Sequence, residues 1–222
     1  MPSKFLYGKK EHFIDYMSGK KSPRFSDLSH YSRLENDLMR DDEMSKKFIL
    51  KKNEIFIKIN GHLISPSELT SDSVIEIPTR HCYCLCLSNK KNDPELFHKF
   101  KADTCIEVDV SYLIELLLHV TRTHLPNTII EAKNITYYAQ DNSLSMVSYL
   151  TPQAAVFFKP DFFSHEAEHR LAMFFPFDKT GFKMKNGEIV PFYTKNRSNH
   201  LNFKFKDRDI IKRTIIDVGY NK

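Results

Sequence analysis

Short apolar stretches recur along the chain, either alternating with polar residues or continuous, and turn or capping residues separate them. Period-two alternation, or a short apolar run, predicts a β-strand. The predicted strands lie at residues 4–7, 24–25, 54–59, 62–65, 73–77, 82–88, 104–110, 128–133, 135–139, 154–160, 168–175, 188–193, 201–206 and 214–218. Asn60-Gly61 between two of them is typical of a hairpin turn.

Three segments have the apolar period of an amphipathic helix, at residues 9–18, 92–100 and 112–123. Gly19 suits the position after the first helix, and Asp93 suits the N-cap of the second. We expect Ser111 to cap the third. The apolar positions expected to face inward are Phe13, Ile14, Met17, Leu96, Phe97, Phe100, Leu113, Leu116, Leu117 and Val120.

Many short strands with about three helices predict an α+β fold with a mixed, largely antiparallel sheet. The 222 residues are 41% hydrophobic, which is enough to bury a real core. The chain has 6 glycines and 10 prolines, and so few argue against a long disordered linker. We therefore expect a single domain over residues 1–222, with room for a small subdomain.

The chain contains no run of about 18 apolar residues, so neither a transmembrane helix nor a membrane partner is expected. The stretch MPSKFLYGKKEHF lacks the apolar core of a signal peptide, which makes a cytoplasmic protein the default expectation. The net charge of +5 is compatible with a nucleotide or nucleic-acid ligand, and an ordinary soluble surface explains it equally well. Basic residues concentrate in two regions, 46–58 and 179–213, which argues against a single basic DNA-binding arm.

The cysteines Cys82, Cys84 and Cys86 follow one another with period two, and Cys105 stands apart. Alternate residues of one strand converge poorly on a single ion, whereas structural zinc sites usually draw on cysteines two to four residues apart in a turn. Reduced cysteines buried in the core are the favoured interpretation, with a metal site as the alternative.

Glu166, Glu168 and Arg170 occupy every second position of the otherwise apolar stretch FFSHEAEHRLAMFF, residues 162–175. On a strand the three side chains would share one face. Two adjacent carboxylates raise the cost of ionising each other, and the arginine would offset that cost. Such a group can orient a sugar hydroxyl and stabilise a cationic transition state. A solvated face or a structural ion pair on an edge strand is the alternative.

The segment LENDLMRDDE concentrates charge in a few residues, namely Glu35, Asp37, Arg40, Asp41, Asp42 and Glu43. Several carboxylates so close together could hold a divalent cation through their oxygens. The spacing matches no EF-hand loop, because no glycine stands at the turn position, and a polar loop is the alternative.

Asp109, Glu131 and Lys133 form a further candidate constellation. Restriction-type nucleases use an aspartate followed by a Glu-x-Lys pair on adjacent strands to hold Mg²⁺ and activate water. This pattern is short enough to arise by chance in most charged proteins, so it supports only a third hypothesis.

Several of these segments together resemble a bacterial family of domains whose chemistry is not established. The resemblance covers about residues 5 to 175, and its most specific motif is K-P…F…E-x-E-x-R. The sequence departs from the family pattern after Arg40, where a glycine is more usual. The matching positions are Tyr7, Tyr31, Glu35, Arg40, Asp42, Glu43, Ser88, Lys159, Glu166, Glu168 and Arg170.

The layout of that family is similar to ADP-ribosyltransferase folds, and the resemblance implies NAD as the substrate. Glu168 would stabilise the oxocarbenium ion as nicotinamide leaves, and Glu166 would orient or deprotonate the acceptor. Tyr31 would stack on nicotinamide, and Tyr7 stands on the first strand, where such enzymes usually have His or Arg. The remaining residues expected to bind substrate are Arg40, Asp42, Glu43 and Arg170.

The resemblance also implies an effector role in bacterial stress or anti-phage defence, because such domains are often encoded in defence and toxin loci. The main alternative is a non-catalytic module that binds a protein or a nucleic acid. A Mg²⁺-dependent nuclease is the third possibility.

Overall fold

The computed structural model describes residues 3–34, 42–139 and 150–221, and these form two compact units. The sheet unit comprises residues 1–42, 81–135 and 165–222, and the hairpin unit comprises residues 43–80 and 136–164. Helices and a largely antiparallel main sheet confirm the predicted α+β class. Whether the two units count as one domain stays a prediction.

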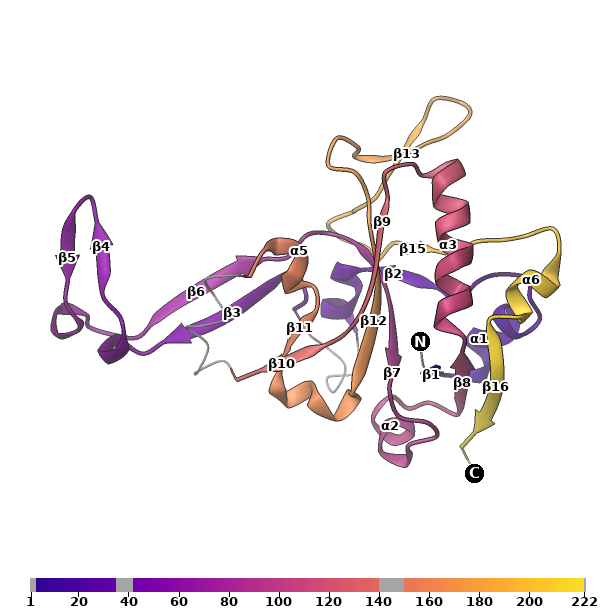
Figure 1. The fold of residues 1–222 in the computed structure, drawn as a ribbon, viewed down its shortest axis with the longest axis horizontal. Coiled ribbons are helices and arrows are strands. Elements are labelled where there is room, and N and C mark those ends of the chain that lie inside the picture. Colours follow the sequence, from indigo (N-terminus) through magenta and orange to yellow (C-terminus); the bar gives the residue numbers. More distant parts are fainter. Residues whose placement is uncertain (1–2, 35–41, 140–149, 222) are drawn as a thin grey trace. The chain divides into compact units, whose positions relative to one another are not determined.

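The sheet unit is built on an eight-stranded antiparallel sheet (Figure 1). Six strands follow the order β15-β2-β7-β1-β8-β16, and β12 pairs with both β7 and β9. The eight strands are β1 (Lys4–Gly8), β2 (Phe25–Asp27), β7 (Tyr83–Ser88), β8 (Thr104–Val108), β9 (Ile129–Asn134), β12 (Glu168–Phe174), β15 (His200–Leu201) and β16 (Ile215–Tyr220).

The sheet forks at β7. Along the first edge of this strand, all six residues of β7 pair with β12. On the other, Tyr83 and Cys84 pair with β2, whereas Ser88 pairs with Phe5 of β1. The described strands therefore leave residues 85–87 without a partner on that edge, and the fork opens beside Cys86.

Helix α3 (Val110–His124) lies along the sheet in Figure 1 and supplies Leu113 and Leu117 to its main apolar core. The strands contribute Leu85 and Leu171 to the same core. Asp109 caps this helix, since its carboxylate accepts from the Tyr112 N–H at 2.9 Å. The prediction of a Ser111 cap was thus wrong by two residues, because the helix begins earlier than its apolar period suggests.

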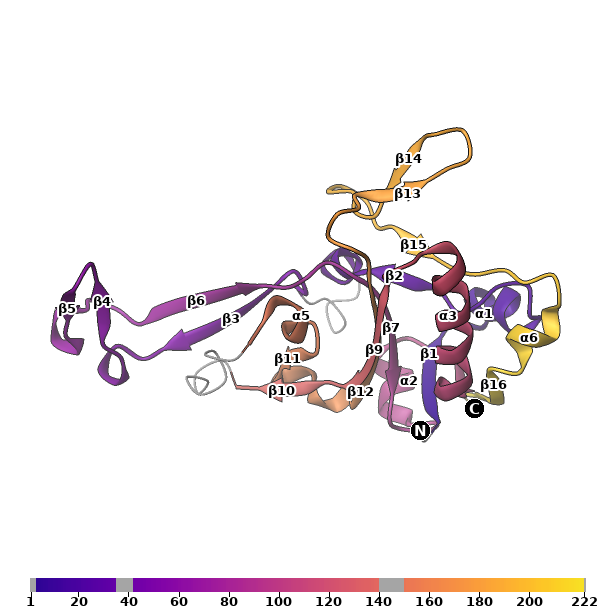
Figure 2. The ribbon, with the colours of Figure 1, turned by 45° about the horizontal axis from the view of Figure 1, so that its top comes forward.

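The other helices of the sheet unit are short. They are α1 (Lys10–Met17), α2 (Pro94–Lys99), α6 (Arg208–Lys212) and the 3-10 helix η1 (Leu28–Arg33). Asp93 accepts hydrogen bonds from the second and third N–H groups of α2, which confirms it as an N-cap. Gly19 follows α1 at φ 73°, as expected, but Ile14 is 54% exposed rather than inward. Figure 2 shows β13 (Gly181–Lys183) and β14 (Ile189–Pro191) as a separate hairpin.

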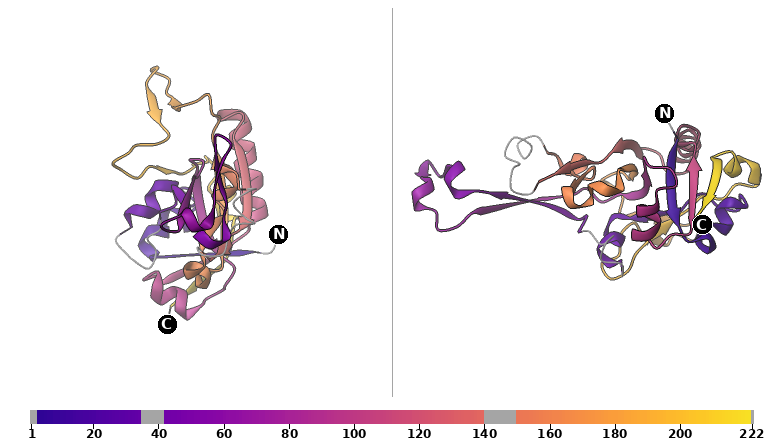
Figure 3. Two further views of the ribbon diagram at one scale, coloured as in Figure 1. Left: turned by 90° about the vertical axis from the view of Figure 1, so that its left-hand side faces the viewer. Right: turned by 90° about the horizontal axis from the view of Figure 1, so that it is seen from below.

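The hairpin unit consists of small paired strands (Figure 3). Strand β3 (Ser45–Leu50) pairs with β6 (Ser73–Pro78), β4 (Ile57–Ile59) with β5 (His62–Ile64), and β10 (Thr136–Tyr138) in parallel with β11 (Phe158–Pro160). Asn60 and Gly61 have φ of 48° and 87°, which confirms the predicted turn. Helix α5 (Pro152–Ala155) and the 3-10 helices η2 (Lys52–Glu54), η3 (Pro66–Glu68) and η4 (Asp161–Glu166, which continues into the sheet unit) complete the chain.

Two features of the hairpin unit differ from the prediction. Strand β3 was not predicted, because Lys46 and Lys47 within it break the apolar pattern, although Phe48 and Leu50 are buried. Residues 154–160 form the end of a helix and a short strand instead of one strand. Within the described residues, no helix has the length and apolar character needed to cross a membrane.

Candidate functional site

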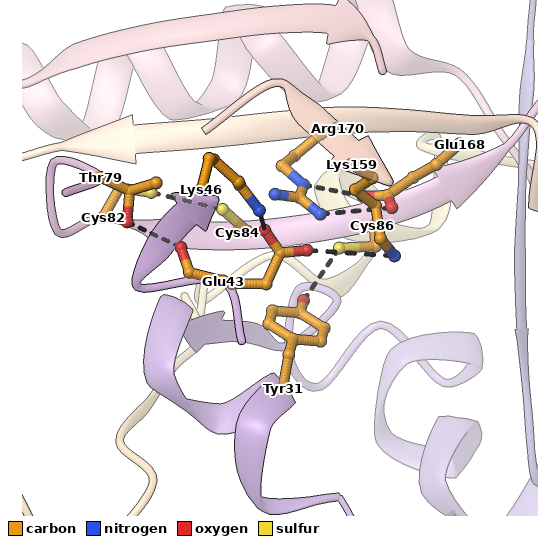
Figure 4. Close-up of polar contacts among 10 residues, drawn as sticks. All are labelled: Tyr31, Glu43, Lys46, Thr79, Cys82, Cys84, Cys86, Lys159, Glu168 and Arg170. Carbon is orange, nitrogen blue, oxygen red and sulfur yellow. Dashed lines mark hydrogen bonds and ion pairs between the residues drawn. The ribbon is translucent and has the colours of Figure 1, made fainter. Parts of the chain in front are cut away.

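The Glu168–Arg170 pair is a buried pair of charged residues in the sheet unit. Both residues lie on β12, an interior strand between β7 and β9. Arg170 donates from Nε to Oε1 of Glu168 at 2.7 Å and from a terminal nitrogen to Oε2 at 3.2 Å (Figure 4). The residues are 0% and 4% exposed. They do not form a solvated face or lie on an edge strand, and their burial must be offset by good hydrogen bonding.

Tyr31 and Cys86 lie beside this pair, and sequence reasoning did not connect them. Cys86 is the cross-strand partner of Arg170, so both side chains share one face of the sheet. The Cys86 thiol donates to the Tyr31 hydroxyl oxygen at 3.0 Å, and the Arg170 guanidinium carbon is 6.0 Å from the centre of the Tyr31 ring (Figure 4). The register of β7 against β12 places Cys86 opposite Arg170, and the position of η1 brings Tyr31 to both, so the strand spacing alone does not reveal these contacts.

The Cys86 thiol and the Tyr31 phenol, which lie beside the Glu168–Arg170 pair, both stay protonated at neutral pH. Burial raises the pKa of the Cys86 thiol well above its usual range, and the Glu168 carboxylate raises it further. Burial also raises the pKa of Tyr31, with Cys86 as the next cause. The local arrangement is a charged Glu–Arg pair against a neutral phenol and a neutral thiol.

Glu166 does not share the strand face, contrary to the prediction. It ends η4, and Ala167 follows with φ of 44°, which breaks the alternation before β12 begins at Glu168. The Ser88 hydroxyl donates to the Glu166 carbonyl oxygen at 2.7 Å and anchors this turn. The Glu166 residue is 6% exposed, so its carboxyl is buried near the start of the strand.

Tyr7 is held by other contacts. Its hydroxyl donates to the Lys90 carbonyl and accepts from the Asp93 N–H, each at 2.8 Å. Its ring packs edge-on against Phe97 at 5.2 Å. The structure therefore ties Tyr7 to the start of α2, and places Tyr31, not Tyr7, against Arg170.

The predicted acidic segment is only partly described. Arg40 and Glu35 lie outside the described residues, and Asp42 is exposed. Glu43 belongs to the hairpin unit, where it is 0% exposed and its carboxylate is 2.7 Å from Lys46 Nζ and 3.9 Å from Lys159 Nζ (Figure 4). Glu43 is therefore held in a buried ion-pair cluster of that unit.

The three residues of the nuclease hypothesis are not brought together. Asp109 caps α3, whereas Glu131 and Lys133 pair with each other on β9. Lys133 instead lies directly opposite Arg170 on the neighbouring strand. Across the described ranges, no group of three or more His, Cys, Asp or Glu residues could hold a metal ion.

The four cysteines are free, and Cys86 is only partly buried. Cys82, Cys84 and Cys105 are buried, with Cys82 and Cys84 sulfurs 3.4 Å apart. These thiols line the sheet face that carries Arg170.

Comparison with protein-family models, with curated proteins and with solved structures finds no match for this chain. The resemblance to the E-x-E-x-R family therefore stays a prediction, and any function must be argued from the site alone.

Proposed function

We propose that the chain is an NAD-using, ADP-ribosyltransferase-like protein in which Glu168 is the catalytic carboxylate. The observation that carries the proposal is the buried Glu168–Arg170 pair beside Tyr31, at the fork of the sheet. Replacing a buried ion pair by apolar residues is often neutral or stabilising. A pair kept in an interior strand is therefore a candidate for chemistry rather than for stability.

The proposed chemistry needs a fixed negative charge beside a developing positive one. As the bond between ribose and nicotinamide breaks, its electron pair leaves with nicotinamide, and positive charge develops on the ribose ring. The Glu168 carboxylate would stabilise that charge, and water or an acceptor would then form the new bond and lose a proton.

The neighbouring groups have roles in the same proposal. Arg170 keeps Glu168 ionised and oriented, and the Tyr31 ring offers an aromatic surface to nicotinamide. Glu166 remains the candidate for orienting the acceptor. An effector role in bacterial stress or anti-phage defence, with a protein or nucleic-acid target, is part of the proposal.

A non-catalytic binding module is the second candidate, and one observation favours it. The bidentate Arg170–Glu168 contact satisfies both charges within the strand, as a structural pair would. In that case a partner would be recognised elsewhere on the surface.

Incubating the protein with labelled NAD and cell lysate separates the two. The proposal expects label transfer or nicotinamide release, lost in Glu168→Gln and reduced in Glu166→Gln. Glu107→Gln is the matched control, because Glu107 lies on β8 of the same sheet and is also paired with a cation, Lys91. Absence of both reactions in the wild-type protein would favour the binding module.

A further inference from the structure

A half-open groove lies in the sheet unit, away from the Glu168 site. It has a volume of about 540 Å³ and is lined by the last turns of α3, by β13 and by the segment before α6. The nine lining residues are His119, Val120, Thr123, His124, Leu125, Phe182, Phe203, Lys204 and Phe205. Sites for small molecules usually measure about 300–1,000 Å³.

The floor of this groove is aromatic and firmly held. Phe182 packs edge-on against Phe192 at 4.7 Å, and Phe203 packs edge-on against Phe25 at 6.4 Å. The Phe203 backbone is also held in place, since its N–H donates to the Ser22 hydroxyl at 2.9 Å. Because these rings are anchored from behind, they offer a preformed apolar surface to a planar ligand.

The rim of the groove has one sign of charge. None of the nine lining residues is acidic, whereas Lys204 and the imidazoles of His119 and His124 can all donate hydrogen bonds. The Thr123 hydroxyl is already engaged, because it donates to the His119 carbonyl at 3.3 Å.

Two neighbouring charges act against an anion there, and both are offset. Lys204 lies close enough to Asp15 to help lower its pKa, but Lys21 is the main cause of that lowering. The carbonyl end of α3 carries partial negative charge, and Arg122 and His124 stand in its last turn.

We propose that this groove binds a small aromatic anion, such as an aromatic carboxylate or sulfonate, with its rings on Phe182, Phe203 and Phe205 and its acid group toward Lys204. The site is separate from the proposed NAD chemistry and does not depend on it.

Fluorescence titration with 1-anilinonaphthalene-8-sulfonate tests this, with N-phenyl-1-naphthylamine as the uncharged probe. We expect saturable binding of the sulfonate below about 1 mM. Lys204→Glu should weaken sulfonate binding about fivefold or more and leave the uncharged probe within about twofold. Val120→Trp, which fills the groove, should abolish the binding of both probes.

Lys58→Glu is the matched charge control, since Lys58 is exposed in the hairpin unit. It should bind both probes like the wild-type protein, and thermal melts of all variants should coincide. The proposal is overturned if the wild-type protein shows no saturable binding. It is also overturned if Lys204→Glu weakens both probes equally, or if Val120→Trp binds the sulfonate unchanged.

Discussion

Arg170 donates hydrogen bonds from two nitrogens to the carboxylate of Glu168, which lies two residues before it on the same interior strand. Neither side chain reaches solvent to any extent. Transfer of such charges out of water is costly, and mutual attraction offsets that cost only in good geometry. Each partner thus offsets the free-energy cost of burying the charge of the other.

Removing one member of this unit should destabilise the fold strongly. Arg170→Met leaves the Glu168 carboxylate buried without its main cation, and we expect a loss of about 3–5 kcal/mol in the free energy of unfolding. The double variant Glu168→Leu/Arg170→Met should lose less than Arg170→Met alone. Urea denaturation measures the free energy of unfolding of these variants. A loss in the double variant equal to the sum of the losses in the two single variants would contradict the coupling.

Acid should weaken the fold through the buried His169 and the half-buried His30. Burial lowers the pKa of His169 to about 4, with Lys4 as a further cause, and burial together with His200 lowers that of His30 to about 4. A lowered folded-state pKa means that the stability contributed by the neutral imidazole is present above about pH 6.5 and is lost as the pH falls toward 4. For the buried His169 the full loss amounts to about 3 kcal/mol.

Urea denaturation at pH 7.5, 5.5 and 4.5 measures this loss, with His169→Gln as the test variant. The variant should lose less stability than the wild-type protein between pH 7.5 and 4.5. The exposed His124 serves for comparison, and His124→Gln should follow the wild-type curve. A wild-type stability that rises between pH 6.5 and 4.5 would contradict the account.

Native thiols should react slowly. All four cysteines are free, and burial raises the pKa of both Cys86 and Cys105. Because the thiolate is the reactive form, alkylation by iodoacetamide at pH 8 should be at least about tenfold slower in the native protein than in urea. Tyr31→Ala, which uncovers Cys86, should speed the modification of that residue. Mass spectrometry after peptide digestion assigns the modified cysteine, and equal rates at Cys86 with and without Tyr31 would refute the contact.

The start of α3 gives a direct test of helix capping. Asp109→Ala should cost about 1 kcal/mol, because an N–H of the first turn loses its acceptor. Ser111→Ala should change stability by less than about 0.5 kcal/mol. Chemical denaturation measures both losses. A larger loss for Ser111→Ala than for Asp109→Ala would contradict the Asp109 cap and favour the Ser111 cap that the sequence pattern predicts.

Local patterns predicted most of the sheet unit, because strand alternation, Asp93 and Gly19 act within a few residues. The start of β12 could be predicted for the same reason. Strand β3 escaped prediction, since Lys46 is buried against Glu43 and a polar residue there hides the apolar face.

The site depends on register, which the sequence does not display. Glu168 and Arg170 were visible as a spaced pair, but Cys86 faces Arg170 because of how β7 aligns with β12, and Tyr31 reaches Cys86 from η1. Glu166 was misplaced because a single positive φ at Ala167 ends the alternation. Long-range strand pairing and one backbone angle therefore determine which side chains lie together at the site, and the residue spacing alone does not show this.

Nicotinamide release from NAD by the purified protein, measured for wild type, Glu168→Gln and Glu107→Gln, tests the central proposal most directly. Glutamine keeps an oxygen that can accept from Arg170 but leaves the buried guanidinium without its counter-charge, so Glu168→Gln should be less stable than the wild-type protein, and a thermal melt selects a temperature at which both are folded. The account predicts release by the wild-type protein, a loss of about 100-fold or more in Glu168→Gln, and a change within about twofold in Glu107→Gln. A folded Glu168→Gln protein that releases nicotinamide at the wild-type rate, or a wild-type protein that releases none, would contradict it.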